Sequence, residues 1–168
     1  MDTKLLARGA ILTALGEVLL YLAGLFPGGS LALTALAGLL PAALVISGGL
    51  KWGCLTWLAT GALGLILLPN KAVALLYALV FGPYTLWKSR IERLGRLLPE
   101  WVLKLAVFNG VLAVFRLAFS GYFAQVTEVL PVSGWILWAV LNLVFAVYDI
   151  GCTRLIAAWL RRLGKAGA

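Results

Sequence analysis

The sequence predicts an all-α integral membrane protein in which six helices form a single transmembrane bundle. Of its 168 residues, 63% are hydrophobic and 12% are charged, and the mean hydropathy of +1.04 is far above that of soluble domains. The apolar residues form runs close to the about 20 residues that a helix needs to cross a bilayer. Basic residues gather in every second connection, as the positive-inside rule expects.

Glycine, proline and charged residues divide the chain into six apolar runs. The first run carries Glu17 and ends without a small-x-small cleavage site, so we interpret it as a span rather than a signal peptide. The connections are short, which favours one domain over residues 1–168. The predicted spans are about 5–26, 30–50, 52–68, 72–87, 105–126 and 134–159.

The distribution of charge predicts how the spans are oriented. Lysine and arginine total 14 against 6 acidic residues, which gives a net charge of +8. Most of the cations lie near the termini, at Lys51 and in the segment 88–104, whereas Lys71 is the one basic residue in the other connections. The positive-inside rule therefore places both termini in the cytoplasm and the protein in the cell membrane. Because the excess charge serves topology, it does not indicate a nucleic-acid partner.

The segment 88–104 has the pattern of an amphipathic helix. Its apolar residues recur at helical spacing, while Lys88, Arg90, Arg93 and Arg96 take the other face. We expect this segment to lie along the cytoplasmic surface of the membrane. It either anchors to anionic lipid headgroups or uses Arg90, Arg93 and Arg96 to dock a partner, and the sequence leaves both open.

The composition argues against an enzyme. The chain has no histidine, and its two cysteines, Cys54 and Cys152, lie in apolar segments. The commonest general base and most zinc sites are therefore excluded. Asp149 lies near Cys152 on neighbouring turns, but no third group orients them for nucleophilic catalysis. No P-loop or other nucleotide motif occurs, so we expect no catalytic residue, metal or cofactor.

Polar residues within the predicted spans are the candidate ligand site, because burying each of them in a membrane is costly. Counted from the midpoints of their spans, Glu17 and Arg116 lie near the bilayer centre, and Asn142 lies slightly outward. Two interpretations remain open. Glu17 and Arg116 form a buried structural ion pair, or Glu17, Arg116 and Asn142 line a solute cavity that opens to the outside.

Two other polar residues in the spans have uncertain roles. Asn109 lies in the inner half of the fifth predicted span, and Asp149 lies about two helical turns inward of Asn142. Asp149 has Arg116, Arg8 and Arg154 as candidate partners.

Small residues and prolines also mark the spans. Ala10 and Ala14 share one face of the first span, where they let another backbone approach, either from within the bundle or from a partner subunit. Pro41 and the pair Gly82-Pro83 remove backbone donors from the second and fourth spans, and such interruptions can shape a cavity.

Three of these features occur together in a chain of this length and helix number. They are the Ala10-x-x-x-Ala14 pattern, the glycine-rich stretch GGLKWGCLTWLATGALGLIL at 48–67, and the basic segment before the fifth span. In this the chain resembles the substrate-binding S components of energy-coupling factor transporters. The resemblance implies that Ala10 and Ala14 contact a transmembrane coupling subunit, that cytoplasmic ATPases supply the energy, and that a small solute such as a vitamin binds near the outer side.

The alternative is a membrane scaffold without transport activity. The small membrane subunit of the bacterial rod-shape machinery is similar in helix number and size. In such a protein the buried charges are structural only.

Overall fold

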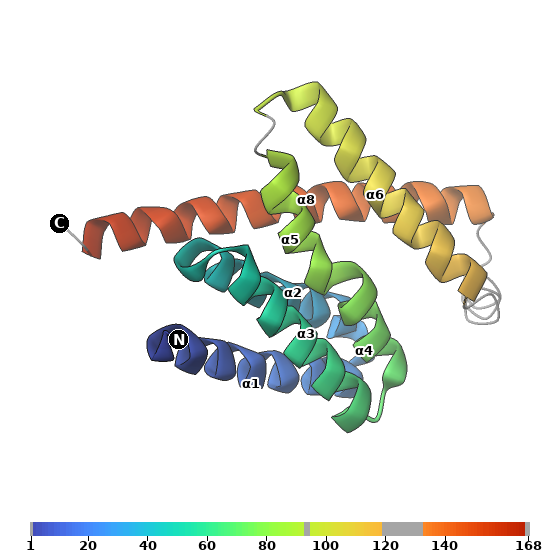
Figure 1. Ribbon diagram of the computed structural model, residues 1–168. Coiled ribbons are helices and arrows are strands. Elements are labelled where there is room, and N and C mark those ends of the chain that lie inside the picture. Colours follow the sequence, from blue (N-terminus) through green and yellow to red (C-terminus); the bar gives the residue numbers. More distant parts are fainter. Residues whose placement is uncertain (1, 93–94, 119–132, 167–168) are drawn as a thin grey trace. The chain divides into compact units, whose positions relative to one another are not determined.

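The computed structural model describes residues 2–92, 95–118 and 133–166, and every regular element in these ranges is a helix (Figure 1). The predicted all-α class is therefore confirmed. The elements are α1 (Thr3–Leu25), the 3-10 turn η1 (Pro27–Gly29), α2 (Ser30–Gly48), α3 (Leu50–Leu67), α4 (Lys71–Leu76), the π-helix η2 (Tyr77–Phe81), α5 (Gly82–Ile91), α6 (Leu97–Ala118) and α8 (Gly134–Ala166).

Five helices in the described part of the chain are long and apolar enough to cross a membrane. They are α1, α2, α3, the stretch Leu97–Val114 of α6 and the stretch Gly134–Ala157 of α8. The chain thus has the helices of a multi-pass membrane protein. The predicted span 72–87 is not among the five, because its residues are divided among α4, η2 and α5. The orientation of the termini stays a prediction.

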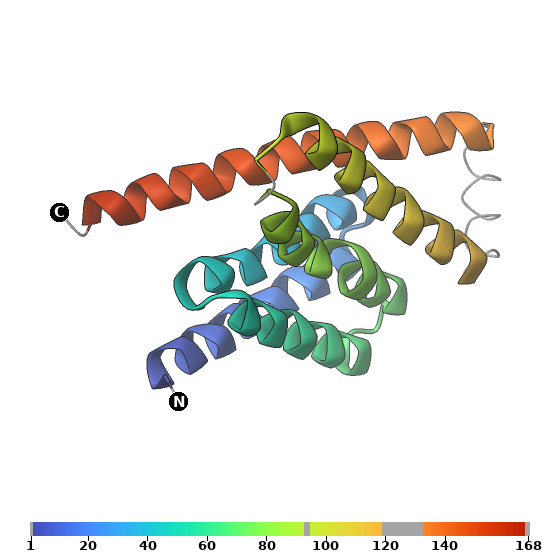
Figure 2. The same ribbon diagram turned by 45° about the horizontal axis from the view of Figure 1, so that its top comes forward.

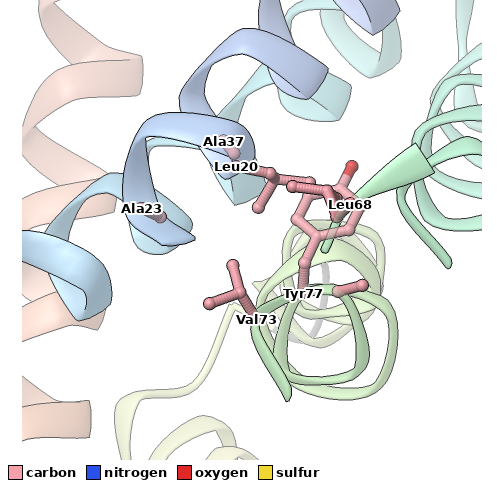
Figure 3. Close-up of a cluster of buried hydrophobic side chains, with 7 residues drawn as sticks. Leu20, Ala23, Ala37, Leu68, Val73 and Tyr77 are labelled. Atoms are coloured by element: carbon pink, nitrogen blue, oxygen red, sulfur yellow. The ribbon is translucent and has the colours of Figure 1, made fainter. Parts of the chain in front are cut away.

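The chain forms two compact units, Met1–Arg96 and Leu97–Ala168. In the first unit, α1, α2 and α3 pack against one another, and α4, η2 and α5 pack on α2 and α3 (Figures 1 and 2). Buried side chains from α1, α2, α4, η2 and the end of α3 form its core (Figure 3), namely Leu20, Ala23, Ala37, Leu68, Val73, Ala74 and Tyr77. That all helices form a single bundle stays a prediction.

Glycine lets the helices of the first unit approach closely. A Cβ atom added to Gly38 would lie 2.7 Å from the backbone oxygen of Phe81, and one added to Gly16 would lie 2.9 Å from Cγ2 of Thr60. Both distances are shorter than real Cβ contacts. Side chains at these positions would therefore push η2 away from α2 and α3 away from α1, which is the packing role of small residues in membrane helices.

The two proline sites that were predicted to interrupt helices, Pro41 and Gly82-Pro83, affect the backbone differently. Helix α2 continues through Pro41. In contrast, the segment Tyr77–Phe81 before Gly82-Pro83 is a π-helix, in which the Gly82 amide donates to the carbonyl of Tyr77 instead of Ala78. Pro83 has no amide hydrogen to continue the α-helical ladder, and the wider turn accommodates its ring.

The bounds of the later helices differ from the prediction. Helix α5 continues to Ile91 and α6 begins at Leu97, so residues 97–104 are the first two turns of α6 rather than a separate surface helix. Helix α6 carries Arg116 in its last described turn. Residues 119–126 of the predicted fifth span lie outside the described residues. Helix α8 extends to Ala166, beyond the predicted end at 159.

Candidate functional site

Glu17 lies at the edge of the buried face of α1. Thr13, Gly16 and Leu20 on this face are buried, and Glu17 itself is partly buried. Its Oε1 atom is enclosed and has no hydrogen-bond partner among the described residues, and its carboxyl group faces the backbone of Gly64 on α3. Glu17 makes no ion pair with a described lysine or arginine of its own unit. A buried carboxyl oxygen of this kind is an exception that needs a physical account.

The hydroxyl of Tyr77 is a second enclosed oxygen in the same unit. Tyr77 is fully buried on η2, and its Oη atom has no hydrogen-bond partner in the described part of the chain. Figure 3 shows its ring beside Leu20, Leu68 and Val73. The polar groups near the hydroxyl are the side chain of Thr60 on α3 and Glu17 on α1. We call Glu17, Thr60 and Tyr77 the Glu17 cluster.

The local structure explains how three elements bring these side chains together. Thr60 is buried, and its methyl group packs where a Cβ atom of Gly16 would lie, so the glycine brings α3 up to α1. Tyr77 is the first residue of the π-helix that precedes Gly82-Pro83. Other buried threonines, Thr34 and Thr56, donate to the carbonyl four residues earlier at 2.7 and 3.0 Å. Those hydroxyls are satisfied within their own helices.

The second unit contains a buried ion pair. Nζ of Lys104 on α6 lies 3.0 Å from Oδ2 of Asp149 on α8, and the two side chains are 5% and 3% exposed. The aromatic ring of Trp101 lies 5.8 Å from the same Nζ atom. The partner of Asp149 is therefore Lys104. Lys104 is not among the candidate partners predicted from the sequence, because the charge pattern assigns this lysine to the surface segment 88–104.

Two asparagines pair on the same two helices. Nδ2 of Asn109 donates to Oδ1 of Asn142 at 2.9 Å, and Nδ2 of Asn142 donates to Oδ1 of Asn109 at 3.2 Å. Each amide also donates to the carbonyl four residues earlier in its own helix. The rings of Phe108 and Phe145 stack beside them, with centroids 4.2 Å apart. These paired contacts fix the antiparallel register of α6 and α8.

Arg116 lies near the end of α6 and is exposed. Together with Gly134, Trp135 and Trp138 it lines an open depression of about 500 Å³. Asn142 donates to the carbonyl of Trp138, so it lies one turn along α8 from this depression. Lys104 lies twelve residues earlier on α6, about 18 Å away at 1.5 Å per residue. Its partner Asp149 is thus not the counter-ion of Arg116.

The predicted site residues fall in different units. Glu17 belongs to the first unit, and Arg116 and Asn142 belong to the second. The pairing of Glu17 with Arg116 stays a prediction. Ala10 and Ala14 lie on the exposed face of α1, and Arg90 and Arg96 are exposed as well. Arg93 lies outside the described residues.

Sequence reasoning missed Thr60, Tyr77 and Lys104. A threonine or tyrosine in an apolar helix is common, and only the helix packing shows that these two hydroxyls lie in the same part of the unit as Glu17. The signal for Tyr77 was Pro83, six residues later, since proline within a membrane helix disturbs the backbone before it.

Comparison of the chain with protein-family models, curated proteins and solved structures finds no match. The likeness to S components therefore rests on the residues quoted from the sequence.

Proposed function

We propose that this chain is the solute-binding membrane subunit of an energy-coupling factor type transporter, which delivers a small molecule to ATPase-driven partner subunits. The observation that carries the proposal is the split character of α1. Thr13, Gly16 and Leu20 are buried against the chain's own helices, whereas Ala10 and Ala14 are exposed on another face. Two alanines one turn apart leave room for a second helix to approach the backbone, which suits a coupling subunit.

The proposed solute site is the depression lined by Arg116, Trp135 and Trp138. A guanidinium group binds carboxylates through paired hydrogen bonds, and indole rings offer flat apolar contact area. A solute with one carboxylate and a planar apolar part fits both. Both termini are proposed to be cytoplasmic, so this end of α8 would face outward. A cysteine at Gly29 should then react with an impermeant reagent in intact cells, and one at Arg96 should not; the reverse result would contradict the orientation.

Co-purification tests the proposal. The full chain, isolated from its native membrane, should bring with it a multi-pass coupling subunit and ATPases. The double variant Ala10→Leu/Ala14→Leu should lose these partners while it keeps its thermal stability. Ala62→Leu, a matched enlargement at an exposed position of α3, should keep them. Unfolding of the double variant would show that the Ala10 and Ala14 face packs internally, and capture of cell-wall proteins instead of ATPases would favour a scaffold.

The scaffold remains the second candidate because of the Asn109–Asn142 pair. The amide of Asn142 is already satisfied by Asn109, which is what a structural role requires.

A further inference from the structure

We propose that the Glu17 cluster is a proton-binding site, in which Glu17 is a neutral carboxylic acid in the folded protein. The inference goes beyond the proposed transport role and does not depend on it. It rests on two enclosed oxygens, Oε1 of Glu17 and Oη of Tyr77, that lack hydrogen-bond partners among the described residues and that α1 and η2 bring to the same part of the first unit. Thr60 adds a third oxygen from α3.

Among the described residues of the first unit, no lysine or arginine forms an ion pair with Glu17, and the buried Lys88 on α5 pairs with Glu92 at 2.7 Å. Helix α2 carries no titratable side chain, and α3 carries Lys51 and Cys54. Lys51 is exposed and lies thirteen residues from Gly64 on α3, about 20 Å along the helix. On α4, Nζ of Lys71 donates to the carbonyls of Leu65 and Ile66 at 2.7 and 3.2 Å. These hydrogen bonds hold its ammonium group at the C-terminal end of α3.

Helix α1 itself supplies no nearer positive charge. Arg8 lies nine residues before Glu17, about 13 Å along the helix, and is exposed. A partly buried carboxylate without a counter-charge is more costly than the neutral acid in the same place. A bound proton removes that charge with no further ligand.

A proton also suits the hydrogen-bonding groups of the cluster. The neutral acid has one O–H donor and one carbonyl acceptor, and the hydroxyls of Tyr77 and Thr60 can each donate and accept. In the proposed state, the acid and the phenol of Tyr77 are hydrogen-bond partners. Three oxygens are few for a sodium ion, which prefers a fuller shell of oxygen ligands, whereas they are sufficient for one shared proton.

Infrared spectroscopy of the full chain in lipid at neutral pH tests the proposal directly. The chain has only 6 acidic side chains, so the carbonyl band of a buried carboxylic acid can be assigned by mutation. The wild-type protein should show this band. It should disappear in Glu17→Gln, persist in the control Glu100→Gln, and shift in frequency in Tyr77→Phe because its hydrogen bond changes. If Glu17→Gln does not fold, the shift in Tyr77→Phe still tests the site.

Three outcomes would overturn the proposal. The first is the absence of the band from the wild-type protein at neutral pH. The second is a band that appears only in Arg116→Gln, which would make Arg116 the counter-ion of an ionised Glu17. The third is a thermal stability that rises with sodium chloride but not with choline chloride, and does so only when Glu17 is present, which would identify a sodium site.

Discussion

Nε1 of Trp57 donates a 3.0 Å hydrogen bond to the backbone carbonyl oxygen of Ala78. In the π-helix η2, the Gly82 amide bonds to the carbonyl of Tyr77, so the next carbonyl, that of Ala78, would take the amide of residue 83. That residue is Pro83, which has no amide hydrogen. The indole of Trp57 therefore supplies the donor that the proline removes, as a buried backbone in an apolar setting requires.

Trp57→Phe should destabilise the first unit by about 1–3 kcal/mol, because it leaves the Ala78 carbonyl unsatisfied. In a Pro83→Ala background the cost should be smaller, since the new amide can bond to Ala78 or to Leu79. Unfolding by denaturant in a mild detergent measures both costs. Trp87→Phe, at a position 54% exposed, is the control and should change little. Equal costs in the two backgrounds would show that the indole does not replace the missing amide.

The sequence predicted that the backbone is disturbed at Gly82-Pro83 but not how the disturbance is accommodated. The partner, Trp57, lies 21 residues before Ala78, and only the packing of α3 on η2 brings it there. The first three spans were predictable because each is one apolar run between glycine or proline turns. The bounds of the fourth and fifth spans were not predictable in this way. The charged residues of 88–104 have the pattern of a surface helix, but Lys104 is buried in an ion pair with Asp149.

Asp149→Asn should destabilise the second unit by about 3–5 kcal/mol, because it leaves the Lys104 ammonium buried without its counter-ion. The double change Lys104→Met/Asp149→Leu should recover much of this loss, since apolar side chains of similar size replace both charges. Thermal unfolding of the singles and the double measures the recovery. Glu100→Gln, in the first turn of α6, serves as the control for loss of a carboxylate. A double variant as unstable as the sum of the singles would contradict a direct pair.

The Asn109–Asn142 pair should show a coupling of about 0.5–2 kcal/mol in a double-mutant cycle. Each single change to leucine leaves the other amide without its cross-helix partner, whereas the double change removes both. Unfolding of the two singles and the double in the same detergent gives the coupling directly. Exposed Leu143→Ala, next to Asn142 on α8, should be additive with Asn109→Leu. A coupling near zero would mean that the pair does not hold α6 to α8.

The candidate site could be predicted only in part. Residue depth along the spans identified Glu17, Asn109, Asn142 and Asp149 as polar groups in apolar helices, and all four lie in helices of the structure. Depth does not give the angle at which a side chain leaves its helix. Asn142 therefore looked like a neighbour of Arg116, although the direct partner of its amide is Asn109.

Glu17 on α1 and Arg116 on α6 are expected to contribute independently to stability. The sequence places both near the same depth, as an ion pair or as part of a solute cavity, but Arg116 is exposed in the last described turn of α6. Arg116 lines an open depression where water can hydrate the guanidinium group, so it does not need a carboxylate partner. We therefore expect the effects of Glu17→Gln and Arg116→Gln on the free energy of unfolding to add within about 0.5 kcal/mol.

A buried pair would behave differently in the same experiment. Either single change would then cost about 3–5 kcal/mol by stranding the other charge, and the double would be more stable than the sum of the singles. The free energy of unfolding of the wild-type protein, both singles and the double, measured in one detergent, decides between the two. A coupling energy above about 1 kcal/mol would show that Glu17 and Arg116 form an ion pair, and Glu17 would then need no proton to balance its charge.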